Sequence, residues 1–111
     1  MTIGDPQPRR GEVWWVRVDK RRPAVVVQTD RVREARVRSF LVVPLTSRLH
    51  LEGLPGNVRL EKQDTGLSKV SVANVYDVQK VFRADFAERV RTLPNAALAR
   101  LAAGLRLALE L

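Results

Sequence analysis

The sequence has few of the residue types that most enzymes use for catalysis. Its 111 residues include no cysteine and a single histidine, His50. Without cysteine there is no disulfide, thiolate metal site or thiol nucleophile, and one histidine cannot form an acid–base pair within a chain. We also find no glycine-rich phosphate loop and no acidic cluster with metal-ligand spacing. These absences predict a protein without cofactor or metal, in which His50 is exposed and incidental.

Long hydrophobic runs are also missing. No apolar segment approaches the length of about 20 residues that a membrane-spanning helix needs, and the N-terminus lacks the apolar core of a signal peptide. The sequence therefore predicts a cytoplasmic protein with no membrane partner. Residues 1–10 carry Gly4, Pro6 and Pro8 without periodicity, which predicts a flexible arm. Residues 11–111 suit one domain.

Positive charge, in contrast, is abundant and uneven. The net charge is +8, and residues 1–48 hold eleven Lys and Arg against five Asp and Glu (+6), whereas residues 49–111 hold nine against seven (+2). An excess in one half indicates a polyanionic partner, nucleic acid before membrane. The alternative is an arginine-rich composition set by codon usage, with the side chains simply solvated.

The stretch Arg21 to Val27 places two arginines directly before a buried apolar segment. A guanidinium stays charged at any working pH and offers a planar fork of donors that suits phosphate oxygens. Pro23 restricts Arg22 to an extended conformation. Arg22 is therefore a candidate phosphate ligand, and the alternative is a solvated basic turn at the end of a hairpin.

The pattern along the chain predicts a mainly β fold. Alternating or dense apolar residues predict strands at 12–18, 24–28, 40–47, 57–61 and 67–78, with an exposed arginine-rich excursion at 31–38 and a loop at 49–56. Pro44 cannot donate to a ladder, so it should mark a bulge, an edge or a strand exit. Helical spacing predicts a short helix at 84–90 and a longer one at 94–110, whose leucine stripe includes Leu101 and Leu109.

Two further local features bear on function. Trp14 and Trp15 fall on opposite faces of the first strand, so one should be core and the other, beside Arg17, a stacking platform or a subunit contact. At the end of the 40–47 strand, Thr46 and Ser47 emerge just before the basic Arg48. Such hydroxyls either satisfy the turn backbone or contribute to a site.

Four motifs together resemble the MazF/PemK family, the endoribonuclease toxins of bacterial toxin–antitoxin pairs. They are Gly-Glu-Val-Trp-Trp-Val at 11–16, Arg-Arg-Pro-Ala-Val-Val-Val at 21–27, Val-Pro-Leu-Thr-Ser at 43–47 and Val-Ala-Asn-Val at 72–75. The resemblance runs from Gly11 to the C-terminus. It implies an SH3-like barrel of antiparallel strands with a C-terminal helix (α+β), a homodimer, and silencing by a cognate MazE-like antitoxin.

The resemblance also implies an activity and its residues. Such enzymes cut single-stranded RNA without metal, using the substrate's 2′-hydroxyl to leave a 2′,3′-cyclic phosphate. The family's catalytic Arg and Thr fall on Arg22 and Thr46. Arg22 would hold the non-bridging oxygens of the phosphorane, and Thr46 would orient one of them or pass a proton. The candidate RNA-binding residues around them are Arg17, Lys20, Arg21, Ser47, Arg48, Asn74 and Asp77.

Two positions depart from the family's pattern. Only Asp19, Lys20 and Arg21 stand between the first strand and Arg22, where many members have a longer loop, and Asp77 occupies a position that is often Gln. A carboxylate there repels phosphate and accepts only from base donors. Two alternatives stay open: a non-catalytic gyrase poison on the same fold, which the Leu-Glu-Leu terminus disfavours, and an RNA-binding module that lost catalysis.

Overall fold

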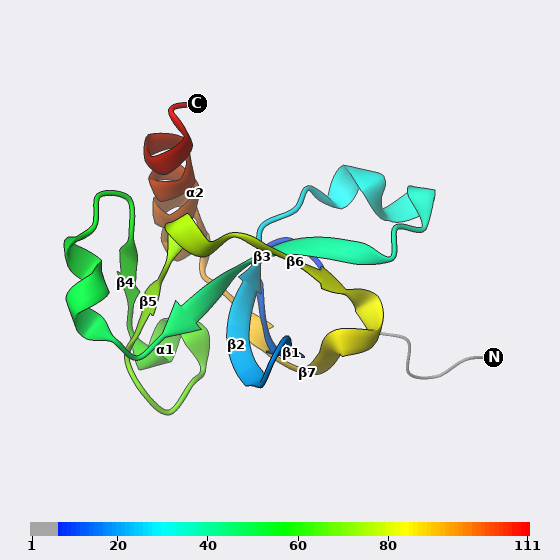
Figure 1. The fold of residues 1–111 in the computed structure, drawn as a ribbon, viewed down its shortest axis with the longest axis horizontal. Helices are drawn as coiled ribbons and strands as arrows, with labels where there is room; N and C mark the ends of the chain where they lie inside the picture. The colour runs from blue at the N-terminus through cyan, green and yellow to red at the C-terminus, as the bar shows by residue number, and fades with distance from the viewer. Residues whose placement is uncertain (1–6) are drawn as a thin grey trace.

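The fold is an antiparallel β sheet with a C-terminal helix (Figure 1). The computed structural model describes residues 7–111. Its strands are β1 (Glu12–Arg17), β2 (Arg21–Val26), β3 (Ser39–Thr46), β4 (Val58–Leu60), β5 (Ser71–Ala73), β6 (Gln79–Phe82) and β7 (Phe86–Thr92). Its α-helices are α1 (Lys62–Thr65) and α2 (Asn95–Leu109), and short 3₁₀ turns are η1 (Asp30–Ala35), η2 (Leu49–Gly53), η3 (Val75–Asp77) and η4 (Arg83–Asp85).

Strand β3 is the centre of the sheet. The strands pair in the order β4-β5-β3-β2-β1-β7, and β6 pairs with the first half of β3, so among the described residues the ladder stays open. On that side of β3, pairing with β6 ends at Val42 and pairing with β5 begins at Leu45. Pro44 lies in this gap, where its missing N–H costs no ladder bond to either strand. The strand therefore continues through Pro44, which marks a change of partner.

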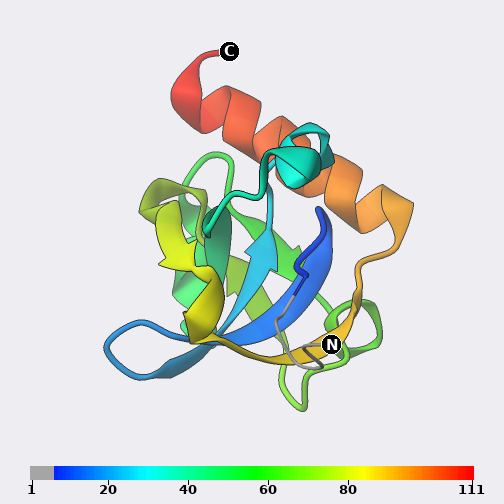
Figure 2. The ribbon, with the colours of Figure 1, turned by 90° about the vertical axis from the view of Figure 1, so that its right-hand side faces the viewer.

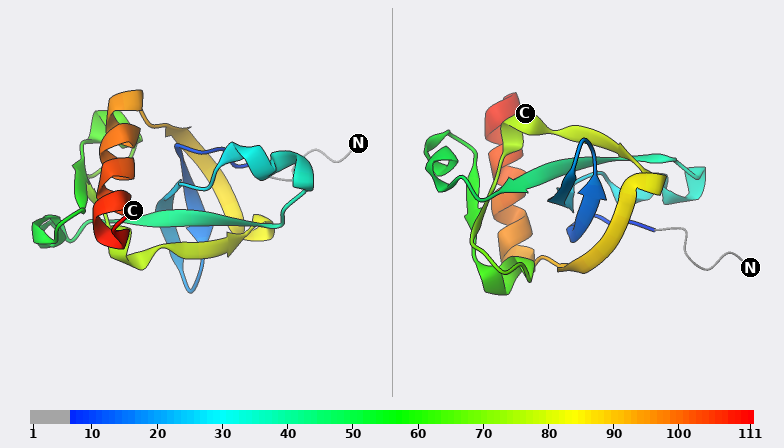
Figure 3. Two further views of the ribbon diagram at one scale, coloured as in Figure 1. Left: turned by 90° about the horizontal axis from the view of Figure 1, so that it is seen from above. Right: turned by 60° about the horizontal axis from the view of Figure 1, so that its bottom comes forward.

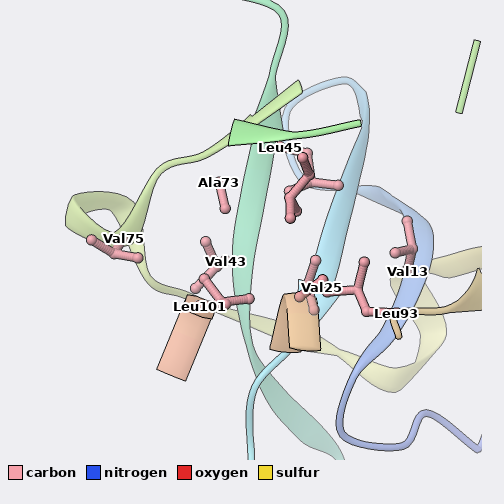
Figure 4. Close-up of a cluster of buried hydrophobic side chains, with 10 residues drawn as sticks. Val13, Val25, Val43, Leu45, Ala73, Val75, Leu93 and Leu101 are labelled. Atoms are coloured by element: carbon pink, nitrogen blue, oxygen red, sulfur yellow. The ribbon is translucent and has the colours of Figure 1, made fainter. Parts of the chain in front are cut away.

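The central strands bury both of their faces, which gives two hydrophobic cores. Val13, Val25 and Val43 lie side by side in register and pack with Leu101 of α2 (Figure 4). Their neighbours face the other way, because side chains alternate along a strand. Trp14 and Phe40 there meet the Phe86 ring edge-on, each at 5.5 Å between ring centroids. Trp14 is thus the core tryptophan that the sequence predicted, and Trp15 is half-buried.

Helix α2 covers the first core, while the β1–β2 loop protrudes away from it (Figures 2 and 3). At Gly104 the helix comes very close to the chain before β4. A Cβ on Gly104 would lie 2.0 Å from the Gly56 carbonyl oxygen. Only glycine permits that approach. Leu101 is fully buried, whereas Leu109, which belongs to the same predicted apolar stripe, is 56% exposed. No described helix is long and apolar enough to span a membrane.

Two predicted elements were wrong. Residues 84–90 are not a helix: η4 ends at Asp85 and β7 follows. Phe86 and Val90 lie on the same side of the chain in a helix and in a regular strand, so their spacing does not distinguish the two. Pairing of β7 with β1 makes this segment a strand. Two register shifts in that pairing let Phe86 and Val90 pack into different cores. The 67–78 strand is also too long, since β5 covers only 71–73 and Asn74 then caps η3 through its side chain.

The remaining predicted elements hold with shifted ends. β1 and β4 fall within the predicted strands, and β3 begins at Ser39, one residue before its prediction. β2 begins at Arg21, three residues before the prediction. The segment between the predicted strands at 57–61 and 67–78 forms α1, which Gly66 closes at φ 77°. The predicted arm at 1–10 lies mainly outside the described residues. Of its end, Pro8 is buried, and the Arg10 backbone N–H donates to Asp30 Oδ1 at 2.9 Å.

Candidate active site

A cavity of about 450 Å³ opens where β2 begins and β3 ends. The strand register explains which residues meet there. Ala24 pairs with Pro44, and because the strands are antiparallel, continuing this register by two residues brings Arg22 opposite Thr46. The cavity is lined by Lys20, Arg22, Pro44, Leu45, Thr46, Ser47, Arg48, Leu51, Asn74 and Asp77.

Seven of the nine residues singled out from the sequence line this cavity. Arg17 and Arg21 do not. They pair with each other where β1 and β2 meet the loop that connects them. The Arg21 guanidinium lies over the Trp15 ring, 4.8 Å from the ring centroid. Its Nη2 also lies 2.7 Å from Glu88 Oε1. Adjacent residues of a strand point to opposite faces, so Arg21 and Arg22 reach different environments.

Arg22 has at least one N–H donor that no other described residue accepts from. Its side chain is 36% exposed, Nη2 lies 3.3 Å from Asp19, and Nε is buried with no hydrogen-bond partner among the described residues. A buried donor without an acceptor is costly, so an incoming anion would recover that energy. Asp19 holds the guanidinium from the solvent side. A hydrogen bond from its own backbone lowers the pKa of Asp19, with the charge of Arg22 as a further cause, so this carboxylate stays ionised.

Thr46 forms the turn that ends β3. Its Oγ1 accepts a hydrogen bond from the Arg48 backbone N–H at 3.1 Å, a local side-chain bond typical of such turns. The hydroxyl proton remains free to donate, because the oxygen serves here as acceptor. One bond thus fixes the Thr46 side chain and brings Arg48 to the cavity wall.

Asn57, which the sequence reasoning missed, supports the far wall. Its Nδ2 donates to Leu51 O at 2.9 Å and to Asn74 Oδ1 at 3.3 Å, and its Oδ1 accepts from the Val75 N–H at 2.9 Å. Leu51 and Asn74 both line the cavity. The only sequence signal was a polar residue at the start of a predicted strand, which does not reveal that its side chain bonds Leu51, Asn74 and Val75.

The charges that line the cavity favour an anion. Lys20, Arg22 and Arg48 face one carboxylate, Asp77, whose Oδ2 accepts from Gln79 Nε2 at 2.9 Å. Cationic walls in a partly enclosed site attract phosphate. His50 is exposed and does not line this cavity. Within the described part of the chain, no group of three or more His, Asp or Glu could hold a metal ion.

The fold and the cavity together define a small β-sheet protein in which three cationic side chains line one cavity. The family model described as the PemK-like, MazF-like toxin of type II toxin–antitoxin systems matches residues 9–109. The chain belongs to this family.

Curated relatives agree over nearly the full length. The chain is 31% identical over 110 residues to endoribonuclease MazF2 of Mycobacterium bovis, covering 92% of this chain and 96% of that protein. Identity and coverage are the same for endoribonuclease MazF6 of Mycobacterium tuberculosis. Probable endoribonuclease MazF5 of Mycobacterium tuberculosis is 31% identical over 105 residues, with 93% and 94% covered.

Solved structures share the fold. The Mycobacterium tuberculosis toxin MazF-mt6 superposes with a TM-score of 0.79 at 23% identity, over 90% of this chain and 97% of that one. A MazE–MazF complex of Deinococcus radiodurans gives 0.77 at 26% identity, over 96% and 100%. The predicted mainly β fold with a C-terminal helix is confirmed.

Proposed function

We propose that this chain is the toxin of a toxin–antitoxin pair, an endoribonuclease that cuts single-stranded RNA without a metal ion. The carrying observation is that Arg22 and Thr46, from separate strand ends, line one cationic cavity. The names of the curated relatives support the reaction class. Residues 11–111 would form the single toxin domain and act in the cytoplasm, where messenger RNA is exposed.

The chemistry follows from the residues available. The substrate's 2′-hydroxyl loses its proton as its oxygen attacks the adjacent phosphorus. The bond from phosphorus to the 5′-oxygen breaks and that oxygen takes up a proton, so the products are a 2′,3′-cyclic phosphate and a 5′-hydroxyl. Negative charge grows on the non-bridging oxygens in the transition state. Arg22 and the Thr46 hydroxyl would donate to these oxygens. In many enzymes, preorganised donors of this kind supply most of the rate enhancement.

Arg22 acts here as a fixed charge. A guanidinium offers several N–H donors in a planar fork and no acceptor, so it contributes hydrogen bonds and positive charge to the transition state. Lys20 and Arg48 would hold flanking phosphates, and Ser47 and Asn74 lie within the same walls. Asp77 would accept from an exocyclic amine of a base, because a carboxylate repels phosphate.

Partners follow from the same surface. A cationic cavity that binds RNA also suits an acidic segment of a MazE-like antitoxin, which would compete with the substrate. A complex with a cognate antitoxin is named for a mycobacterial endoribonuclease of the same fold. We infer that this chain forms a homodimer and binds such an antitoxin, with no cofactor.

The test is cleavage of a long single-stranded RNA in EDTA. We expect discrete cuts that end in a cyclic phosphate, and their loss in Arg22→Ala and Thr46→Ala. Arg106→Ala, an exposed arginine of α2 outside the cavity, is the matched control. Uncut RNA from the wild-type protein overturns the proposal, and trapping of gyrase in a supercoiling assay would replace it with the non-catalytic alternative.

A further inference from the structure

A second cavity, of about 280 Å³, adjoins the first. It shares Leu45 and Ser47 with the Arg22 cavity, so the two meet over the end of β3. Its other walls come from Trp15, Pro23 and the segment between α1 and β5 that carries Ser68 and Lys69, followed by Ser71. We propose that this cavity binds the base of a nucleotide next to the cut, and that it selects uracil or guanine. The inference rests on the proposed ribonuclease function.

The shape and the ring fit a single base. A cavity just below the 300 Å³ at which pockets for drug-sized ligands begin is suited to one flat ring system. Trp15 is half-buried and lines this cavity. Aromatic side chains are the usual platform on which single-stranded nucleic acids stack, since every base has a π-face.

Arg21 supports the Trp15 platform. Its guanidinium lies over the indole, and its ion pair with Glu88 holds it there. A stacked guanidinium and indole keep the ring orientation fixed while leaving cationic charge beside the entry. This placement gives Arg21 a role outside the cavity that contains Arg22.

The polar atoms determine which base fits. Lys69 offers an ammonium group with three donors and no acceptor. The hydroxyls of Ser47, Ser68 and Ser71 can each donate or accept, and among the described residues no carboxylate or carboxamide lines the cavity. Selection between bases therefore rests on Lys69. Ser71 is 4% exposed, and its hydroxyl makes only a long 3.5 Å contact to Lys69 O within the described chain. The Lys69 ammonium group matches the carbonyl oxygens of uracil and guanine and has no lone pair to accept from the amino groups of adenine and cytosine.

The two cavities then read complementary features of one strand of RNA. The phosphate at Arg22 and the base at Trp15 are separated only by the end of β3, where Ser47 is exposed to both. A nucleotide that crosses this strand end places its phosphate on one side and a base on the other. Cleavage would therefore favour uracil or guanine at one fixed position beside the cut.

The experiment compares cut sites rather than total activity. A random-sequence RNA is digested in EDTA, and the product ends are sequenced for the wild type, Lys69→Met, Ser71→Ala and Trp15→Leu. Lys62→Met removes the same charge from an exposed residue of α1 outside both cavities and serves as control. Trp15→Phe keeps a ring and controls for folding.

We expect the wild type to prefer uracil or guanine at one position beside the cut. Lys69→Met should reduce this preference about tenfold, the usual scale for one base contact. Ser71→Ala should reduce it less, and Lys62→Met should leave it intact. Trp15→Leu should lower kcat/KM for all sequences about tenfold, as loss of stacking does, and Trp15→Phe should restore most of it.

Each other outcome overturns the inference. Equal preferences in the wild type, Lys69→Met and Lys62→Met would remove the base site and leave the nuclease in place. Unchanged preferences combined with weaker antitoxin inhibition in Lys69→Met would assign the cavity to the protein partner instead. A wild-type protein that leaves RNA uncut overturns the ribonuclease itself, and the base site with it.

Discussion

The two cavities meet over the end of β3 and present different chemistry. Arg22 lines the first cavity, and Pro23 lines the second. Arg21 lies over the ring of Trp15, which also lines the second cavity. Strand alternation produces this separation, because consecutive side chains point to opposite faces. Three cations line the first cavity, and an indole, three serines and a lysine line the second. A short hairpin can therefore hold a charge-reading site and a base-reading site back to back.

The supports of the two cavities also differ. The first rests on Thr46, which bonds the Arg48 N–H, and on the Asn57 side chain, which ties together three segments. The second draws Ser68 and Lys69 from an exposed loop. Catalysis needs donors that do not reorganise during reaction, whereas base selection tolerates a more adaptable wall. Variants should separate these roles.

Arg22→Ala should have the largest effect. Loss of one preorganised donor to the transition state costs about 10²–10³ in kcat, and we expect the upper end of that range because Arg22 also carries charge. Single-turnover cleavage of a defined RNA measures it. Arg21→Ala removes the same charge from the opposite face and should cost less than about tenfold. Equal losses in the two variants would contradict the separation of the faces.

Thr46→Val should rank second. Valine keeps the shape but removes the hydroxyl that donates and the oxygen that accepts from the Arg48 N–H, so we expect a loss of about 10²-fold in kcat. Thr46→Ser, which restores the hydroxyl, should recover cleavage to within about tenfold of wild type. The same single-turnover assay applies. Wild-type activity in Thr46→Val would exclude the hydroxyl from the reaction.

Asp77→Asn should strengthen RNA binding. It removes the one carboxylate that, among the described residues, lines the first cavity, and relief of repulsion at a partly exposed site is worth about threefold in affinity at low salt. The gain should fade in high salt, because exposed charges are screened. Binding titrations at two salt concentrations measure it. Asp85→Asn, outside both cavities, should change nothing.

Lys20→Met should have the smallest effect, visible mainly in salt dependence. A cation that contacts one phosphate of a single strand contributes about 0.7 to the slope of log affinity against log salt. Lys20→Met should lower the slope by about that amount, whereas Lys62→Met, outside both cavities, should leave it unchanged. Equal slopes for all three proteins would place Lys20 away from the RNA phosphates.

Much of the first cavity was predictable because its residues stand at strand ends that local pattern reveals. Apolar runs located β2 and β3. Pro23 indicated the extended conformation of Arg22, and Pro44 indicated a break in strand pairing near the end of β3. Resemblance to a known family then assigned roles to Arg22 and Thr46. These roles stay predictions until the variants are measured, but the structure does bring the two residues into one cavity.

The errors had a common cause. Residues 84–90 carry Phe86 and Val90 at a spacing that fits a helix as well as a strand, so periodicity could not decide. Hydrogen bonding to β1 decided it. The overlong strand at 67–78 has the same origin, since Asn74 leaves the ladder to cap η3. The Asn74 cap is a local bond to the Tyr76 N–H, but Asn57 also donates to Asn74 Oδ1 from 17 residues away. Both outcomes therefore involve partners that a local pattern does not encode.

The sequence by itself determined that Arg22 and Thr46 flank buried strands, and that no thiol, paired histidine or metal cluster is needed to account for its motifs. Only the tertiary structure decided that Lys20 and Arg48 join Arg22 while Arg21 covers Trp15, and that a second cavity adjoins the first. The physical reason is that neighbouring cations look alike in a sequence. Strand register and the alternation of side chains decide to which face of the sheet each cation points, and therefore which group it can contact.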